Sequence, residues 1–86
     1  MVIRYSKESL KFLKRLDKKS VERIHSAIKG LTCKPPVGDI KVMQGSRDDR
    51  MRLRVGGWRV IYKYGAEAEI EILLVLEIGN RGDIYK

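Results

Sequence analysis

The sequence predicts an α+β domain in which an N-terminal short strand and a two-helix hairpin pack on one face of a mostly antiparallel sheet. Apolar residues recur at helical spacing over residues 7–31, whereas they alternate with period two over residues 50–78. A connection at residues 33–39 that contains proline and glycine separates the two halves. Runs of helix followed by runs of strand are typical of α+β folds, and 86 residues supply one modest core. We therefore expect a single domain over residues 1–86.

The first half begins with alternating residues 2–5, which predict a short strand. Ser6 can cap a helix that follows it. The apolar side of that helix would carry Leu10, Phe12, Leu13 and Leu16. A second helix should begin near Asp17 and close at or shortly after Gly30. Its apolar side would carry Val21, Ile24, Ile28 and Leu31.

The second half is expected to form the sheet, because Pro35 and Pro36 cannot continue a helix. Strands are predicted at residues 40–43, twice within a hairpin at residues 50–64, and at residues 69–78. A turn at Ala66-Glu67 should precede the last strand, so the order of elements is β, α, α, β, β, β, β. We expect the last strand to be central, with Leu73 and Val75 on one face. Its other face would carry Ile70, Ile72, Leu74, Leu76 and Ile78.

The hairpin is the most informative segment, because Gly56-Gly57 is a two-residue loop that tolerates the positive φ angles of a tight turn. Alternation then directs one set of side chains to the core, namely Met51, Leu53, Val55, Trp58, Val60, Tyr62 and Tyr64. The opposite face carries five cations, which are Arg50, Arg52, Arg54, Arg59 and Lys63. The register puts Arg54 opposite Arg59, and Arg50 opposite Lys63. Like charges directly across a ladder cost about 0.2–1 kcal/mol per pair, so this is either a solvated face or an anion site.

The net charge of +8 and the pI near 9.9 favour a polyanionic partner, with nucleic acid as the first candidate. Cys33 is the one cysteine and His25 the one histidine, so we expect no disulfide within the chain, no metal site and no cofactor. The apolar run at residues 70–78 is interrupted by Glu71 and Glu77, and the N-terminal residues are too charged for a signal peptide. The sequence therefore predicts a cytoplasmic protein that does not contact a membrane.

The last residues, 79–86, read GNRGDIYK, with Arg81 between two glycines and Tyr85 four positions later. Together with the order of elements and the hairpin step Gly57-Trp58-Arg59, the ending I-G-N-R-x-x-I-Y resembles the RelE branch of the RelE/ParE toxin superfamily over nearly the whole chain. The resemblance implies a fold like that of small microbial ribonucleases. It implies a type II toxin that enters the ribosomal A site and cleaves translated mRNA by metal-independent 2′-hydroxyl attack, which inhibits translation. It also implies a cognate antitoxin that wraps the toxin, and a complex of the two that binds operator DNA.

The resemblance places the catalytic set at Arg52, Arg59, Arg81 and Tyr85, and Arg50 with Arg54 and Lys63 would bind substrate. Arginines suit phosphate oxygens because they donate two parallel hydrogen bonds, and nearby cations would favour the phenolate of Tyr85 as a general base. Relatives carry lysine where this chain has Arg50 and Arg52, and guanidinium is a poor proton donor. The general acid is left open between Arg81, water and a ribosomal group.

Two other functions remain open at this stage. The superfamily includes a branch of ParE-like toxins that inhibit DNA gyrase without chemistry of their own, although that branch generally lacks the terminal arginine and tyrosine. The replacement of two lysines by arginine also fits a catalytically inactive toxin homologue that acts as an antitoxin-bound co-repressor. Tyr85 would then only pack the C-terminus against the sheet.

Overall fold

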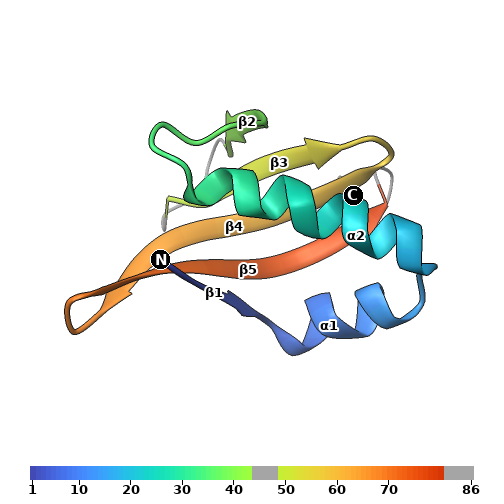
Figure 1. Cartoon of the computed structure of the whole chain (residues 1–86), viewed down its shortest axis with the longest axis horizontal. Coiled ribbons are helices and arrows are strands. Elements are labelled where there is room, and N and C mark those ends of the chain that lie inside the picture. Colours follow the sequence, from blue (N-terminus) through green and yellow to red (C-terminus); the bar gives the residue numbers. More distant parts are fainter. Residues whose placement is uncertain (44–48, 81–86) are drawn as a thin grey trace.

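The computed structural model describes residues 1–43 and 49–80 of the chain, which form a five-stranded sheet with two helices on one face (Figure 1). The elements are β1 (Val2–Tyr5), α1 (Lys7–Lys14), α2 (Lys18–Lys29), a 3₁₀ turn η1 (Gly30–Thr32), β2 (Asp39–Val42), β3 (Met51–Val55), β4 (Trp58–Glu67) and β5 (Ile70–Asn80). The strand order is β1-β5-β4-β3-β2. β1 runs parallel to β5 and the other pairs are antiparallel. The predicted fold class and element order are confirmed.

Both helices begin where the sequence predicts, because a side chain caps each one. Ser6 Oγ accepts a hydrogen bond from the backbone N–H of Ser9 at 3.1 Å and donates one to the carbonyl of Leu76 at 2.7 Å. The cap of α1 therefore also ties this helix to β5. Asp17 accepts a hydrogen bond from the backbone N–H of Ser20 at the start of α2. The hydrogen bond from the Ser20 hydroxyl, together with this backbone bond, lowers the pKa of the Asp17 carboxyl.

The core lies between the helices and one face of the sheet. Ile24, Ile28 and Leu31 contribute from α2 and η1, and all three are fully buried. The sheet supplies Leu53, Val55, Val60, Tyr62, Leu73, Val75 and Ile78. From α1, half-buried Phe12 and Leu13 pack against this cluster. Burial of each large apolar side chain contributes about 1.5–3 kcal/mol, so this layer fixes which face of the sheet is left for function.

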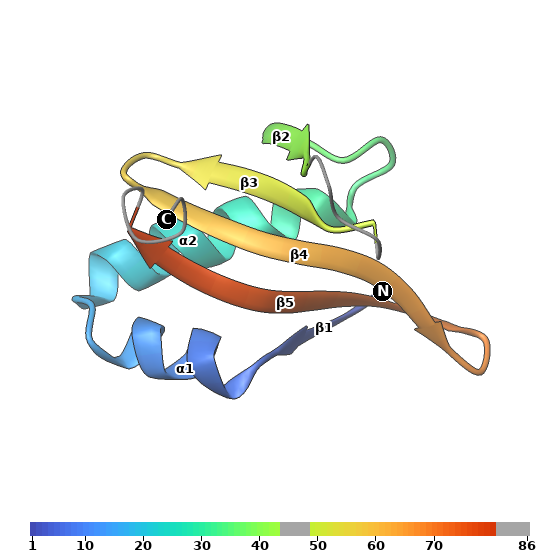
Figure 2. The ribbon, with the colours of Figure 1, turned by 180° about the vertical axis from the view of Figure 1, so that it is seen from behind.

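The sheet turns its other face away from both helices, as the view from behind makes clear (Figure 2). β4 lies in the middle of the strand order, so the prediction that the last strand is central is wrong. β5 is instead second from the edge, because two strands, β3 and β2, continue the sheet beyond β4 while only β1 lies beyond β5.

A β-bulge changes which residues of β5 face the core. Ile61 pairs with Glu77 and Tyr62 pairs with Val75, so Leu76 is an extra residue in the ladder. The extra residue reverses the alternation, and Ile78 joins Leu73 and Val75 in the core cluster. The prediction that Ile78 faces away from Leu73 and Val75 is therefore wrong, because strict alternation assumes that no strand contains an extra residue.

The turn before β5 also differs from the prediction. β4 continues to Glu67, and the chain reverses at Ala68 and Glu69, two residues later than expected. Ala68 adopts a φ of 56°, a left-handed conformation that the sequence does not signal because no glycine or asparagine is present there. In the described residues, neither helix has the length and apolar content needed to span a membrane.

Candidate functional site

The hairpin places cations on the sheet face away from the helices. Gly56 has a φ of 57° in the turn, and Val55 pairs with Trp58 as predicted. Arg54 lies opposite Arg59. We call this surface the arginine face and define it by Arg52, Arg54, Arg59, Ile61 and Lys63. The ladder between β3 and β4 ends at the pair Met51 and Tyr62. The predicted pairing of Arg50 with Lys63 lies one position beyond this end and stays a prediction.

The arginine face is not an ordinary solvated surface. The exposed fraction is 7% for Arg52 and 4% for Arg59, whereas the side chain of Arg54 is 38% exposed. Ile61, directly opposite Arg52, is buried as well. A guanidinium that is removed from water must be held by its surroundings, because burial of an uncompensated charge is very costly. Arg52 and Arg59 are therefore fixed in position, and Arg54 lies at the rim.

Asp39 also belongs to this site, although it was not among the residues predicted from the sequence. Asp39 lies at the start of β2, opposite Arg54 in the ladder. Its carboxylate oxygens lie 3.7 Å from Arg52 Nη2 and 3.8 Å from Arg54 Nε. One signal was available, since Asp39 and Lys41 alternate with Ile40 and Val42, but the partner of this short strand is not evident from the sequence.

Two of the predicted catalytic residues, Arg52 and Arg59, lie on neighbouring strands of one face. The other two, Arg81 and Tyr85, lie outside the described residues, so their position relative to the arginine face stays a prediction. β5 brings the backbone of Gly79 opposite Arg59, two residues before Arg81. Of the predicted substrate-binding residues, Arg50 is exposed and Lys63 is half-buried.

The aromatic residues of the hairpin lie on the helix-covered side. Trp58 is half-buried against the core, and the guanidinium of Arg23 lies 6.0 Å from its ring centroid. Tyr62 is fully buried, which confirms its predicted place in the core. Burial and the neighbouring Tyr64 raise the pKa of Tyr62 well above its ordinary value. Burial also raises the pKa of Tyr5. A raised pKa disfavours the phenolate, so neither Tyr62 nor Tyr5 is suited to act as a general base.

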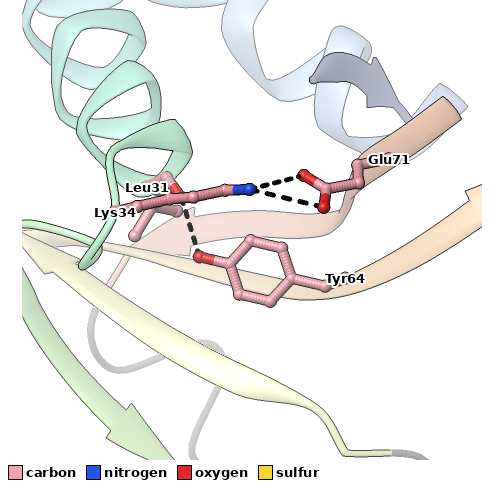
Figure 3. Close-up of polar contacts among 4 residues, drawn as sticks. All are labelled: Leu31, Lys34, Tyr64 and Glu71. Carbon is pink, nitrogen blue, oxygen red and sulfur yellow. Dashed lines mark hydrogen bonds and ion pairs between the residues drawn. The ribbon is translucent and has the colours of Figure 1, made fainter.

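Tyr64 departs from the core prediction, because it lies at the rim and is 38% exposed. Its hydroxyl donates a hydrogen bond of 2.8 Å to the carbonyl of Leu31, and nearby Lys34 forms an ion pair with Glu71 (Figure 3). These contacts tie η1 and the connection after it to the sheet. They also border an apolar groove, which Cys33 and Met1 help to line. Within residues 1–43 and 49–80, no cluster of histidine, cysteine and acidic residues could hold a metal ion.

The fold defined by this sheet and helix pair is shared with solved toxin structures. The archaeal RelE-RelB complex from Pyrococcus horikoshii OT3 matches with a TM-score of 0.72 and 26% identity, covering 95% of this chain and 96% of that chain. The YoeB/ParE toxin from Agrobacterium tumefaciens matches with a TM-score of 0.75 at 19% identity, covering 94% of this chain and 99% of that chain. The toxin-antitoxin complex RelBE2 from Mycobacterium tuberculosis matches with a TM-score of 0.70 at 16% identity, covering 93% and 96%.

The family is given by a sequence profile described as the ParE toxin of the type II toxin-antitoxin system parDE, which matches residues 3–85. The chain belongs to this family, and so to the RelE/ParE superfamily of type II toxins. A search of curated protein sequences finds no significant match. The profile and the structural matches agree on a type II toxin and do not separate mRNA cleavage from gyrase inhibition.

Proposed function

We propose that this toxin is a ribosome-dependent mRNA endonuclease that cleaves translated mRNA in the A site and thereby inhibits translation. The observation that carries the proposal is the pair of buried arginines, Arg52 and Arg59, on adjacent strands of the helix-free face. Arginine forks donate two parallel hydrogen bonds to phosphate oxygens, and a fixed fork does not have to reorganise as charge develops. A gyrase inhibitor that performs no chemistry needs no such arrangement.

The reaction that suits these residues is attack by the RNA's own 2′-hydroxyl. The 2′-oxygen forms a bond to phosphorus, the bond from phosphorus to the 5′-oxygen breaks, and the products are a 2′,3′-cyclic phosphate and a 5′-hydroxyl end. Arg52, Arg59 and Arg81 neutralise the non-bridging oxygens of the pentacoordinate phosphorane. The phenolate of Tyr85 takes the 2′-hydroxyl proton, and the 5′-oxygen receives a proton from Arg81, water or a ribosomal group. Arg50, Arg54 and Lys63 hold the flanking phosphates.

The ribosome is part of this proposal, because the chain itself has weak tools for proton transfer. Correct positioning of the attacking and leaving groups supplies several kcal/mol of the barrier, and a decoding site can impose that geometry on mRNA. Free RNA is therefore a poor substrate. The solved complexes of similar fold pair RelE with RelB, and we extend that pairing to a cognate antitoxin that covers this chain and joins it on operator DNA.

The test is primer extension on an mRNA under translation by purified ribosomes. New cuts are expected when the toxin is added, and none when the same mRNA is given without ribosomes. The double variant Arg81→Ala, Tyr85→Phe should abolish the cuts. Cleavage that continues unchanged in that variant would rule out the site assignment.

Inhibition of DNA gyrase is the second candidate, and the description of the matching family as ParE favours it. It predicts that cleaved gyrase-DNA complexes accumulate while translated mRNA stays intact. If neither effect follows expression without antitoxin, and growth continues, the chain is an inactive homologue that serves as a co-repressor.

A further inference from the structure

The carboxylate of Asp39 lies beside two side chains of the arginine face. Asp39 Oδ1 lies 3.7 Å from Arg52 Nη2, and Asp39 Oδ2 lies 3.8 Å from Arg54 Nε. Arg52 and Arg54 are two positions apart on β3, so their side chains leave the same face of the sheet. The carboxylate therefore spans two arginines in the manner expected of a bridging anion.

Both distances from Asp39 to the arginines are longer than those of a hydrogen-bonded salt bridge. Charge-assisted hydrogen bonds between nitrogen and oxygen are about 2.7–2.9 Å long, so both distances leave room for a better acceptor. The side chain of Asp39 is 57% exposed, and Arg54 is partly exposed as well. The ion pair between Asp39 and Arg54 is exposed to water and contributes only about 0–1 kcal/mol, so an incoming phosphate oxygen can displace the carboxylate from Arg54.

The two arginines would respond differently to such a displacement. Arg52 is buried, so we expect the surrounding packing to hold it in place when Asp39 is displaced. Arg54 lies at the rim, directly opposite both Asp39 on β2 and Arg59 on β4. Its charge is thus shared between an internal acid on one side and a second arginine on the other. Release from Asp39 is what makes the Arg54 charge available to a ligand.

We propose that Asp39 is a specificity-determining residue that stands in for a phosphate on the arginine face and lowers its affinity for loosely held RNA. The ligand class is the phosphodiester backbone of single-stranded RNA, so the inference rests on the proposed function of this face. With Asp39 in place, only RNA that is presented in the correct geometry gains enough contacts to displace the carboxylate. Without Asp39, one more positive charge is open to any single strand.

The experiment measures binding of a fluorescein-labelled 12-nucleotide uridine RNA to the full-length chain, free of antitoxin, by fluorescence anisotropy. Asp39→Asn keeps the shape of the side chain and removes its charge. We expect about fivefold tighter binding at 150 mM KCl, and a salt dependence of log K that is steeper by about 0.7, the value for one additional contact to a single strand. Glu69→Gln is the matched control, because it removes one negative charge at the exposed turn between β4 and β5.

The double variant Asp39→Asn, Arg54→Gln identifies the released charge, and its affinity should return to about the wild-type value. The inference is overturned if Asp39→Asn binds no tighter than Glu69→Gln, or if the double variant keeps the gain. Arg59→Gln tests the face itself. If it binds RNA as well as the wild type, the arginine face is not an RNA site and the proposed function fails with it. Circular dichroism checks that each variant is folded. If Asp39→Asn misfolds, Asp39→Ser takes its place.

Discussion

Positive charge gathers on two regions of this molecule, the arginine face and the helix layer, and the chain builds them in different ways. Over residues 7–29 the helix layer carries eight basic and three acidic residues, and all eight basic side chains are exposed. The basic ones are Lys7, Lys11, Lys14, Arg15, Lys18, Lys19, Arg23 and Lys29. None of them forms an ion pair with another described residue. On the arginine face, by contrast, the two central cations are buried and a carboxylate lies beside them.

The contrast separates attraction from recognition. Exposed lysines remain hydrated and mobile, so they raise the rate at which a polyanion arrives and choose no particular phosphate. Buried arginines on paired strands hold a fixed geometry, which costs free energy of folding and is repaid only when a ligand of matching shape binds. Four predictions test this difference, beginning with the largest effect.

Removal of one buried charge should matter more than removal of two exposed ones. Arg59→Gln is expected to lower the rate of ribosome-dependent mRNA cleavage by about 100-fold, because it removes a fixed donor for the transition state. Lys11→Gln with Lys14→Gln should change that rate by less than about threefold, because the two lysines act only through long-range attraction. Single-turnover primer extension measures both. An equal loss in the two variants would remove the distinction between the regions.

A change of geometry at constant charge is the next test. Arg52→Lys is expected to lower the cleavage rate by about tenfold, because an ammonium group cannot donate the two parallel hydrogen bonds of a guanidinium. Lys11→Arg, the reverse exchange on the helix layer, should have no effect. The opposite result is also informative. Faster cleavage by Arg52→Lys would make this position a proton donor and not a phosphate clamp.

The helix-covered side of the sheet should respond to alkaline pH through Tyr62. Burial raises the pKa of Tyr62 above the unfolded value of about 10, so the folded state holds this proton more tightly. Its contribution to stability is complete below about pH 10 and is lost as the pH rises further, by up to about 1.4 kcal/mol per pH unit for one proton. Urea unfolding at pH 9, 10 and 11 should therefore show a smaller decline for Tyr62→Phe than for wild type. An identical decline in the variant and the wild type would contradict this assignment.

The smallest expected effect is a change in the free energy of unfolding when one exposed lysine of the helix layer is replaced. Lys7→Glu is expected to raise the free energy of unfolding by about 0.5–1 kcal/mol, because a carboxylate suits the start of α1 and pairs with Lys11 one turn later. Lys14→Glu, in the last turn of α1, should bring no such gain. Urea midpoints measure both changes, and the rate of mRNA cleavage should change by less than about threefold in Lys7→Glu. A loss of cleavage would show that the helix layer takes part in recognition.

The sequence predicts best what is determined locally. The Gly56-Gly57 turn fixes the hairpin register within a few residues, so the places of Leu53, Val60 and Arg59 could be read from alternation alone. Ser6 and Asp17 set the helix starts in the same way. These are interactions between residues that are close along the chain, and their geometry is nearly independent of the rest of the fold.

What could not be predicted depends on distant parts of the chain. Asp39 reaches the arginines only because β2 pairs with β3, and the bulge at Leu76 exists only in the pairing of β4 with β5. The burial of Arg52 follows from tertiary packing, which alternation cannot distinguish from a solvated face. The part of the site that was missed is the part that non-local pairing creates.

The parallel pairing of β1 with β5 has a consequence for the synthesis of this toxin. Residues Val2 to Tyr5 pair with Ile72 to Val75, so β1 meets its partner only after the residues between them, 6–71, have been made. The cap of α1 likewise waits for the carbonyl of Leu76. Domains otherwise begin to fold from the N-terminus as they emerge during translation. Here β1 and the start of α1 cannot complete their contacts until β5 has emerged from the ribosome, so the fold of this domain closes late in its synthesis.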